Sequence, residues 1–448
     1  MGGRSPAKAD ASRCSPLRNM MKMRQLLLAL LFCRASSAFA DNWTLASYKA
    51  EVFRVSYEIK RTAEDAEIYK GRYISELARF YLPSVVISAS DAPYSAHNDP
   101  RLRFNRDDTA AGVAASLNLY NNFKDKLSLD SSRLSSKVYE RRLWLERQRV
   151  TLAALGDYYG VLRKKRLLEV VRNSLDSYRQ QYEKITRYYN EGMKSYSDVL
   201  KSELGFRSSQ LSEAGSLEDY RNAVMDFNLS LYRAPETGVE LEDFVSYSTA
   251  SFSAAEGDVD YALSRRPELE ILALERRMAG YSAKKALIER LPGLSIDASY
   301  DRQGLGSWGR PAAGAVNPDY SLKLSLSLPL GPATFSERQS SFEADTALER
   351  ADREIYLRGL QVRREVVSAR LALATAVKRY EVSGLKAGIS KQNLEIVNSR
   401  YNEGRSGIIE LTGAQSDDLS AQSELANAFY DLLLAGARYD AALGRQLW

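Results

Sequence analysis

Hydrophobic residues recur every three or four positions through two long stretches of the chain. No proline lies between Pro100 and Pro235, nor after Pro332, and proline breaks helix interiors. The spacing therefore predicts long paired helices, the first over residues 123–189 and its return over residues 197–232. Apolar positions of the first helix form a heptad seam: Leu168, Val171, Leu175, Tyr178, Tyr182, Ile185 and Tyr189.

Two nearly identical phrases mark the ends of these helices. "RYYNEGMKSYSDVL" and "SRYNEGRSGIIELT" share Tyr-Asn-Glu-Gly, and Asn190 and Asn402 lie 212 positions apart. Gly192 and Gly404 suit the left-handed position that closes a helix. Each phrase is therefore predicted to be the turn of a helical hairpin within a duplicated unit, although Ser383 weakens the seam of the second copy.

The first arm of each hairpin is predicted to be much longer than the second. At 1.5 Å per residue, the arm over residues 123–189 spans roughly 100 Å, about twice the length of its return. We expect residues 43–80 and their counterpart, residues 261–289, to pack over the part of the long arms that the short arms leave uncovered.

Four segments alternate apolar and polar residues, which predicts β-strands. "LSIDASYD" from Leu294 and "YSLKLSLSL" from Tyr320 are the most regular, and residues 112–119 and 85–90 supply the other pair. Strands of about ten alternating residues are typical of membrane barrels, with one face toward lipid and one toward water. An antiparallel sheet with one solvated face is the alternative.

Four strands are too few to close a barrel, and open sheet edges are not tolerated in lipid. Several chains would therefore have to combine their strands. Three chains would contribute twelve strands and two would contribute eight, and strand number alone permits either assembly. The predicted helices are too long to fold back over so small a sheet.

Residues 1–40 are predicted to be a secretory leader. An apolar run over residues 26–32 is followed by Ala38-Phe39-Ala40, an A-x-A cleavage pattern. Met21 is an alternative start, and Cys33 raises a lipoprotein alternative, although a bulky residue precedes it. The remaining organisation is predicted as a first repeat over residues 41–235, a linker over 236–260 and a second repeat over 261–448.

Charge and composition exclude several classes of function. The leader holds seven of the 63 Lys and Arg residues and one of the 57 acids, so the chain after it is electrically balanced, and we expect no nucleic-acid partner. Both cysteines lie in the leader, and the single histidine, His97, lies in a predicted loop. These residues offer no catalytic set, so we expect neither an enzyme nor a cofactor or metal site.

The chain resembles the TolC-like outer membrane factor family over residues 41–448. The resemblance rests on the duplicated layout and on "RPELEILALERRMAGYSAKKALIERLPGLSIDASY", "RYNEGRSGIIEL" and "ALGR". It implies a mainly α fold whose paired hairpins form a periplasmic α-barrel. It also implies a homotrimer whose twelve strands form one barrel in the lipid of a Gram-negative outer membrane.

The resemblance also implies function. The trimer would be the exit duct of a tripartite efflux pump, conducting small molecules from an inner-membrane transporter and a periplasmic adaptor protein. A duct for type I protein secretion is the alternative on the same fold. A secreted coiled-coil structural protein without a pore is a third hypothesis, but it leaves the duplicated strand pairs unexplained.

In this family the hairpin tips form the periplasmic entrance. The family's gate tyrosine falls on Tyr401, while its gate arginine falls on Ser406 and a second acidic ring falls on Gly413, so the sequence departs from the pattern at two positions. The candidate gate residues are Tyr401, Arg405, Ser406, Glu410, Ser197 and Asp198. The turns expected to contact the adaptor are Asn190, Glu191, Gly192, Asn402, Glu403 and Gly404.

Simpler interpretations of these residues remain open. Tyr401 lies on the heptad phase, so it would also suit a core position. Glu410 and Asp198 lie where descending helices begin, and acids there complement the positive end of the helix dipole whatever the function.

Overall fold

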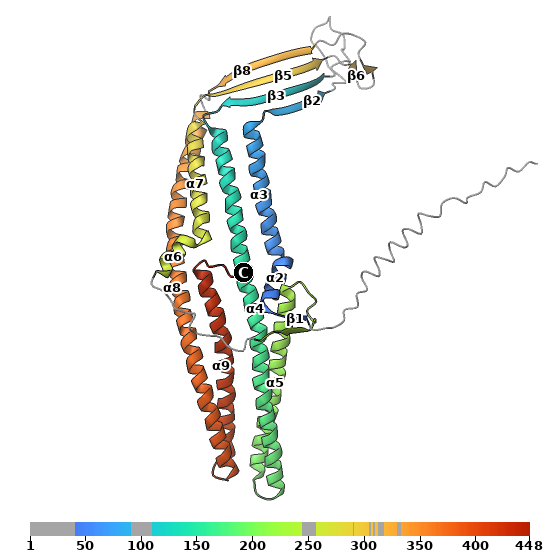
Figure 1. Cartoon of the computed structure of the whole chain (residues 1–448), viewed down its shortest axis with the longest axis vertical. Helices are drawn as coiled ribbons and strands as arrows, with labels where there is room; N and C mark the ends of the chain where they lie inside the picture. Colours follow the sequence, from blue (N-terminus) through green and yellow to red (C-terminus); the bar gives the residue numbers. More distant parts are fainter. Residues whose placement is uncertain are drawn as a thin grey trace, which may run out of the picture.

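A computed structural model of the protein describes residues 41–90, 110–243, 257–289, 291–303, 306–307, 310–311, 318–328 and 333–448. The molecule is a long shaft of helices with a sheet at one end and two hairpin tips at the other (Figure 1). The predicted leader, His97 and most of the predicted linker lie outside the described residues, so those predictions stay untested.

Two helical hairpins form the shaft. The first consists of α4 (Lys124–Asn190) and α5 (Tyr196–Ser230), and the second of α8 (Ala333–Asn402) and α9 (Ile408–Ala442). The predicted bounds of the first hairpin are confirmed to within two residues. In each hairpin the long arm runs the whole length of the shaft, and the short arm covers only its lower half (Figure 1).

Shorter helices cover the upper half of the long arms, as expected from the sequence. They are α2 (Leu45–Val55), α3 (Tyr57–Tyr81), α6 (Asp258–Arg265) and α7 (Pro267–Ile288). Helix α3 packs along α4, and α7 packs between α4 and α8. The four helices α3, α4, α7 and α8 therefore stand side by side beneath the sheet (Figure 1).

The four predicted strands form one antiparallel sheet in the order β2-β3-β5-β8. Their bounds are Ser84–Ser90 for β2, Ala110–Tyr120 for β3, Gly293–Gln303 for β5 and Pro318–Ser327 for β8. A bulge interrupts the pairing of β3 and β5 near Tyr120. Two further strands of two residues each, β6 (Gly306–Ser307) and β7 (Arg310–Pro311), pair with one another.

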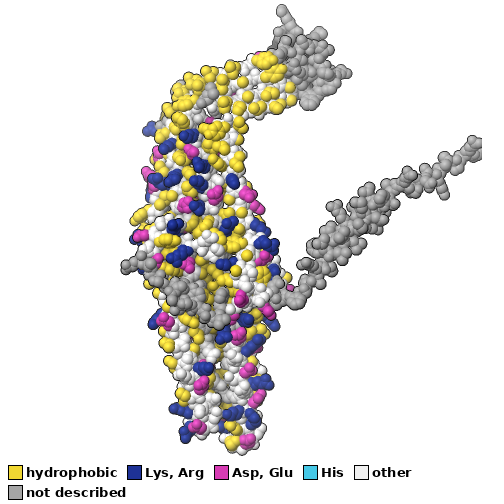
Figure 2. All heavy atoms as spheres, viewed as in Figure 1, with side chains coloured by type: hydrophobic (Ala, Val, Ile, Leu, Met, Phe, Trp, Pro, Cys, Tyr) yellow, Lys and Arg dark blue, Asp and Glu magenta, His cyan; other side chains and the backbone are white. Residues whose placement is uncertain are grey.

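Strand pairing aligns side chains of one kind across the sheet. One cross-strand row contains Val85, Ala115, Ala298 and Leu322, and the adjacent row contains Ser84, Ser116, Asp297 and Lys323. Successive residues of a strand point to opposite faces. The sheet therefore has one apolar face and one polar face, and hydrophobic side chains dominate the visible surface of its described part (Figure 2).

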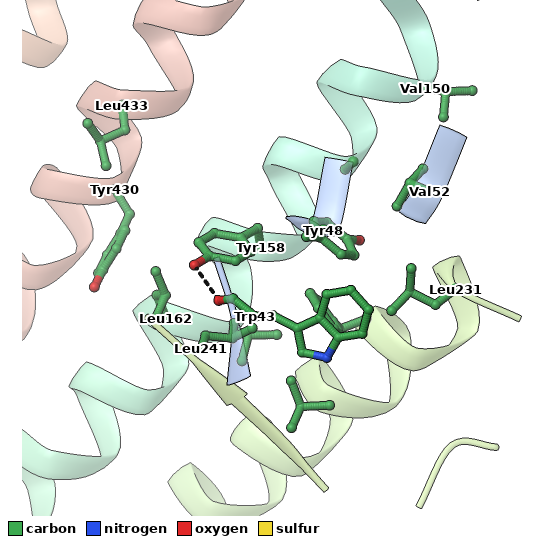
Figure 3. Close-up of a cluster of buried hydrophobic side chains, with 14 of the residues drawn as sticks. Trp43, Tyr48, Val52, Val150, Tyr158, Leu162, Leu231, Leu241, Tyr430 and Leu433 are labelled. Atoms are coloured by element: carbon green, nitrogen blue, oxygen red, sulfur yellow. Dashed lines mark hydrogen bonds between the residues drawn. The ribbon is translucent and has the colours of Figure 1, made fainter. Parts of the chain in front are cut away.

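The largest core cluster lies midway along the shaft. Here β1 (Asp41–Trp43) pairs in parallel with β4 (Val239–Leu241), which lies within the predicted linker. The Tyr48 ring stacks on Phe227 with centroids 4.3 Å apart. The hydroxyl of Tyr158 donates to the Trp43 carbonyl at 3.1 Å (Figure 3). Leu433 and Tyr430 of α9 join the cluster, so both hairpins are anchored at this level.

Among the described helices, none combines the length and the apolar character that a membrane-spanning helix needs.

Candidate functional site

The first hairpin tip is closed by a glycine in the left-handed conformation. Gly192 has φ +74°, and its amide donates to the Tyr189 carbonyl at 2.9 Å. The Met193 amide reaches back to the Tyr188 carbonyl at 2.8 Å. This pair of bonds satisfies carbonyls that the end of α4 would otherwise leave unpaired.

The second tip has the same bonds 212 positions later. Gly404 has φ +73°, and its amide donates to the Tyr401 carbonyl at 3.1 Å. The Arg405 amide donates to the Arg400 carbonyl at 2.8 Å. The repeated phrase is therefore a repeated turn, which confirms that each Asn-Glu-Gly joins the two arms of a hairpin.

The helices that return from the tips begin differently. Ser195 caps α5 by accepting from the Asp198 amide at 3.2 Å, and the Asp198 carboxylate accepts from the Ser195 amide at 3.4 Å. Gly407 caps α9 without a side chain. There the Glu410 carboxylate accepts from the Ser406 hydroxyl at 2.6 Å instead. The helix-start role therefore accounts for both acids, since each lies in the first turn and stabilises it.

A hydrophobic cluster joins the two hairpins just above the tips. It takes residues from both arms of both hairpins, so the tips of one chain are held together by packing. Its buried members are Ile185, Val199, Val397, Tyr401, Ile408, Leu411 and Ala414, with Tyr182 and Leu394 packed against them.

Tyr401 lies in this cluster with only 3% of its surface exposed. Its hydroxyl is buried and makes no hydrogen bond with any residue that the structure describes. Burial, followed by the negative charge of Asp198 and by Tyr188, raises the pKa of Tyr401 to about 12. The Lys194 ammonium lies 4.4 Å from the centre of its ring. A residue from the first tip thus covers the tyrosine of the second.

Polar contacts add to this connection. The Lys184 ammonium of α4 donates to the side-chain oxygen of Asn402 at the end of α8. Arg405 pairs with Glu403 at 3.1 Å within the second turn, where both side chains are largely exposed. Lys184 therefore ties the first hairpin to the turn of the second.

The structure brings most of the predicted residues to the same end of the shaft. The turn residues of both tips are exposed, and so is Ser197 in the first turn of α5. The negative charge of Asp198 contributes to the raised pKa of Tyr401. Arg405 stands apart, because it forms its ion pair within its own turn, with Glu403.

Sequence reasoning missed Lys184 and Lys194. The duplication contained a signal for the second, because Lys194 occupies the position equivalent to Ser406 at the 212-residue offset. No group of His, Cys, Asp and Glu residues suited to a metal ion is found in the described part of the chain.

Comparisons with known proteins agree on one family. The family model described as outer membrane efflux protein matches residues 259–445. Outer membrane protein TolC of Vibrio cholerae is 22% identical over 379 residues, covering 81% of this chain and 82% of the relative. Alkaline protease secretion protein AprF of Pseudomonas aeruginosa is 25% identical over 317 residues, covering 67% and 62%.

Solved structures share the fold. The outer membrane protein VceC of Vibrio cholerae aligns with a TM-score of 0.75 at 14% identity, covering 90% of this chain and 97% of that one. The outer membrane channel MtrE of Neisseria gonorrhoeae aligns with a TM-score of 0.76 at 14% identity, covering 90% and 89%. The duplicated hairpins and strand pairs are therefore those of a known channel fold, and the chain is similar to the TolC-like outer membrane efflux proteins, which are outer membrane proteins of Gram-negative bacteria.

Proposed function

We propose that three copies of this chain form the exit duct of a tripartite efflux pump. The duct passively conducts small molecules that an inner-membrane transporter and a periplasmic adaptor protein deliver to it. The observation that carries the proposal is the sheet, which has one apolar face and two edge strands without a partner among the described residues.

The apolar face is suited to lipid. Leu322, Leu324 and Leu326 of β8 are 74%, 66% and 74% exposed. Large apolar patches on a protein surface indicate a contact with lipid or another protein. On the opposite face, Lys323 and Asp297 pair across the strands, which suits a water-filled lumen.

The two edges of the sheet suit a ring. Strand β2 begins the sheet and β8 ends it. Three successive antiparallel pairings make β8 antiparallel to β2, so β8 of one copy can continue the alternation by pairing with β2 of the next. A head-to-tail contact of this kind closes by rotation, and three copies supply twelve strands without a free edge in lipid.

The helical shaft supports the same ring. Helix α5 exposes Leu200, Leu204 and Leu211 at intervals of four and seven residues, and α8 exposes a similar row. Spacing of this kind is the seam of a coiled coil. In the proposed trimer these rows lie at the sides of each chain, where the neighbouring copies cover them. The exposed row of α8 comprises Val382, Leu385, Ile389 and Ile396.

Protein secretion is the second candidate, since AprF, 25% identical to this chain, is described as a secretion protein. The two candidates share the trimer and differ in cargo. Deleting the gene would separate the two candidates. Loss of an efflux duct should raise drug sensitivity, whereas loss of a secretion duct should remove proteins from the medium.

The trimer and pore have their own test. We expect the purified protein in mild detergent to have three times the mass of the chain and to form conducting channels in planar bilayers. A monodisperse, helical monomer without conductance would contradict the proposal.

We further propose that the hairpin tips form the closed entrance of the duct, with the turn residues in contact with the adaptor. Three copies place Asp198 and Glu410 three times each around one axis, and crowded acids attract cations. Tyr401→Phe together with Asp198→Ala should raise single-channel conductance. Glu410→Ala should reduce cation preference. If the acids serve only the helix starts, each substitution costs at most about 1 kcal/mol and conductance is unchanged.

A further inference from the structure

A serine-lined cavity lies between α3, α4 and α7, just beneath the sheet. Its volume is about 480 Å³. Six serines line it, namely Ser75, Ser128, Ser131, Ser132, Ser135 and Ser282. Four of the six are on α4, at the three- and four-residue intervals that place side chains on one helix face. The cavity is therefore lined by hydroxyl groups, which can donate hydrogen bonds to an acceptor.

Two cations reach the same cavity, Arg72 from α3 and Lys285 from α7. The Lys285 ammonium donates to the Ser128 hydroxyl at 3.2 Å. The Arg72 guanidinium stacks over the Tyr69 ring, 4.5 Å from its centre, an arrangement that leaves its planar donors available. Neither cation forms an ion pair with any residue in the described ranges, whereas Arg141, Arg142 and Arg276 on neighbouring parts of the shaft do.

The lining holds one acid beside its two cations, so cations are in excess. Glu76 lies 3.9 Å from Arg79, a cation that does not line the cavity. The lining therefore combines two cations and a single carboxylate with hydroxyl donors from three helices. Arginine, lysine and hydroxyl groups together are the donors that bind phosphate oxygens.

We propose that this cavity binds a phosphate group. Its place in the fold suggests two sources for that group. Helix α4 begins at Lys124, so the serines from Ser128 to Ser135 lie roughly 6–17 Å along the helix from its start beneath β3. The headgroup of a membrane lipid can reach this depth if the sheet spans the outer membrane. Of the two sources, only the lipid rests on the proposed function. A free phosphate or a phosphorylated solute needs only the cavity.

The test uses the full-length protein as purified in detergent. Inorganic phosphate binding is titrated by ³¹P NMR, and phosphatidylglycerol binding is measured by native mass spectrometry, with diacylglycerol as the lipid without phosphate. We expect Arg72→Gln with Lys285→Gln to weaken binding at least about tenfold, because charge-assisted hydrogen bonds are lost. Arg133→Gln with Lys137→Gln is the matched control, since these exposed cations of α4 do not line the cavity.

Each outcome is decisive. If the unmodified protein and the matched control bind inorganic phosphate and the variant with Arg72→Gln and Lys285→Gln does not, the result supports a site open to free phosphate. A second outcome is that the unmodified protein binds phosphatidylglycerol but neither inorganic phosphate nor diacylglycerol. Loss of phosphatidylglycerol binding in the same double variant then supports a headgroup site. No binding by the unmodified protein, or equal loss in the matched control, overturns the proposal. If the double variant does not assemble, Ser131→Leu fills the cavity without changing charge and must weaken binding to the same degree. Conductance is recorded in parallel, so a failed duct is distinguished from a failed site.

Discussion

The ammonium of Lys194 lies 4.4 Å from the centre of the Tyr401 ring, so a side chain of the first hairpin tip covers a buried tyrosine of the second. A cation over an aromatic face contributes about 0.5–1 kcal/mol at an exposed site. The position equivalent to Lys194 in the second repeat is Ser406, which has no such contact with the first tip. The connection between the hairpins is therefore asymmetric, although the turns themselves are alike.

Lys194→Met should loosen the tips. The substitution removes the cation but keeps a side chain of similar length, so we expect more frequent open events in planar bilayers and a small loss of stability. Lys201→Met is the matched control, because Lys201 is exposed on α5, the helix that follows the turn of Lys194. Equal single-channel records for Lys194→Met and the unmodified protein would exclude a role for this contact in closure.

The tip glycines should be intolerant of a side chain. Gly192→Ala or Gly404→Ala forces a left-handed residue to carry a Cβ, which costs about 1–2 kcal/mol, even though no neighbouring atom lies within 4 Å. Gly71→Ala in α3 is the control. It also has open space but an ordinary helical backbone, so the substitution should stabilise the protein by about 0.5–1 kcal/mol. Thermal unfolding of the three variants measures the difference.

The two faces of β8 should respond differently to charge. Leu324→Arg places a cation on the apolar face and should cost about 2–4 kcal/mol if the residue lies near the bilayer midplane, which abolishes assembly. Ser325→Arg lies on the opposite face and should be tolerated. Trimer formation on gels without heating measures both, and equal losses at the two positions would indicate a soluble sheet.

Asp157 should make the protein sensitive to pH. Burial, followed by the negative charge of Asp226, raises the pKa of the Asp157 carboxyl from 3.8 to about 6. The folded chain therefore binds this proton more tightly than the unfolded chain. The resulting stability is present below about pH 4 and is lost as the pH rises through 6.

Asp157→Asn should therefore stabilise the protein at pH 7 by about 1–2 kcal/mol, allowing for partial solvent screening, and should give no gain at pH 4. Asp176→Asn, at an exposed position of the same helix, is the control. Melting temperatures at the two pH values decide the point, and a gain of equal size at both would refute the linkage.

The elements were predictable from the sequence because their signals are local. Proline-free stretches, glycine turns and strict alternation depend on neighbouring residues, and the bounds of α4 and α5 follow from them to within two residues. The pairing of β1 with β4 was missed, since strands of three residues carry no alternation. Ser383, which interrupts the heptad phase, is nonetheless 1% exposed, with its hydroxyl unpaired among the described residues. The packing of α8 therefore buries this position even though its residue is polar.

The site was only partly predictable. Asp198 and Glu410 were expected at helix starts. The Ser195 cap and the hydrogen bond from Ser406 to Glu410 agree with that interpretation and do not test the gate. The contact of Lys184 with Asn402 joins residues 218 positions apart. Such a contact depends on how two hairpins meet, and no short-range pattern encodes it.

The free edges of the sheet have a genetic consequence. A chain whose β8 edge is blocked, for example by a proline, still offers an intact β2 to the next copy, so in the proposed trimer it joins a ring that it cannot complete. If altered and normal chains are made in equal amounts and mix at random, only about one ring in eight contains normal chains alone. An edge mutation should therefore be dominant over the normal gene, whereas a mutation that unfolds the chain before it can join a ring should be recessive.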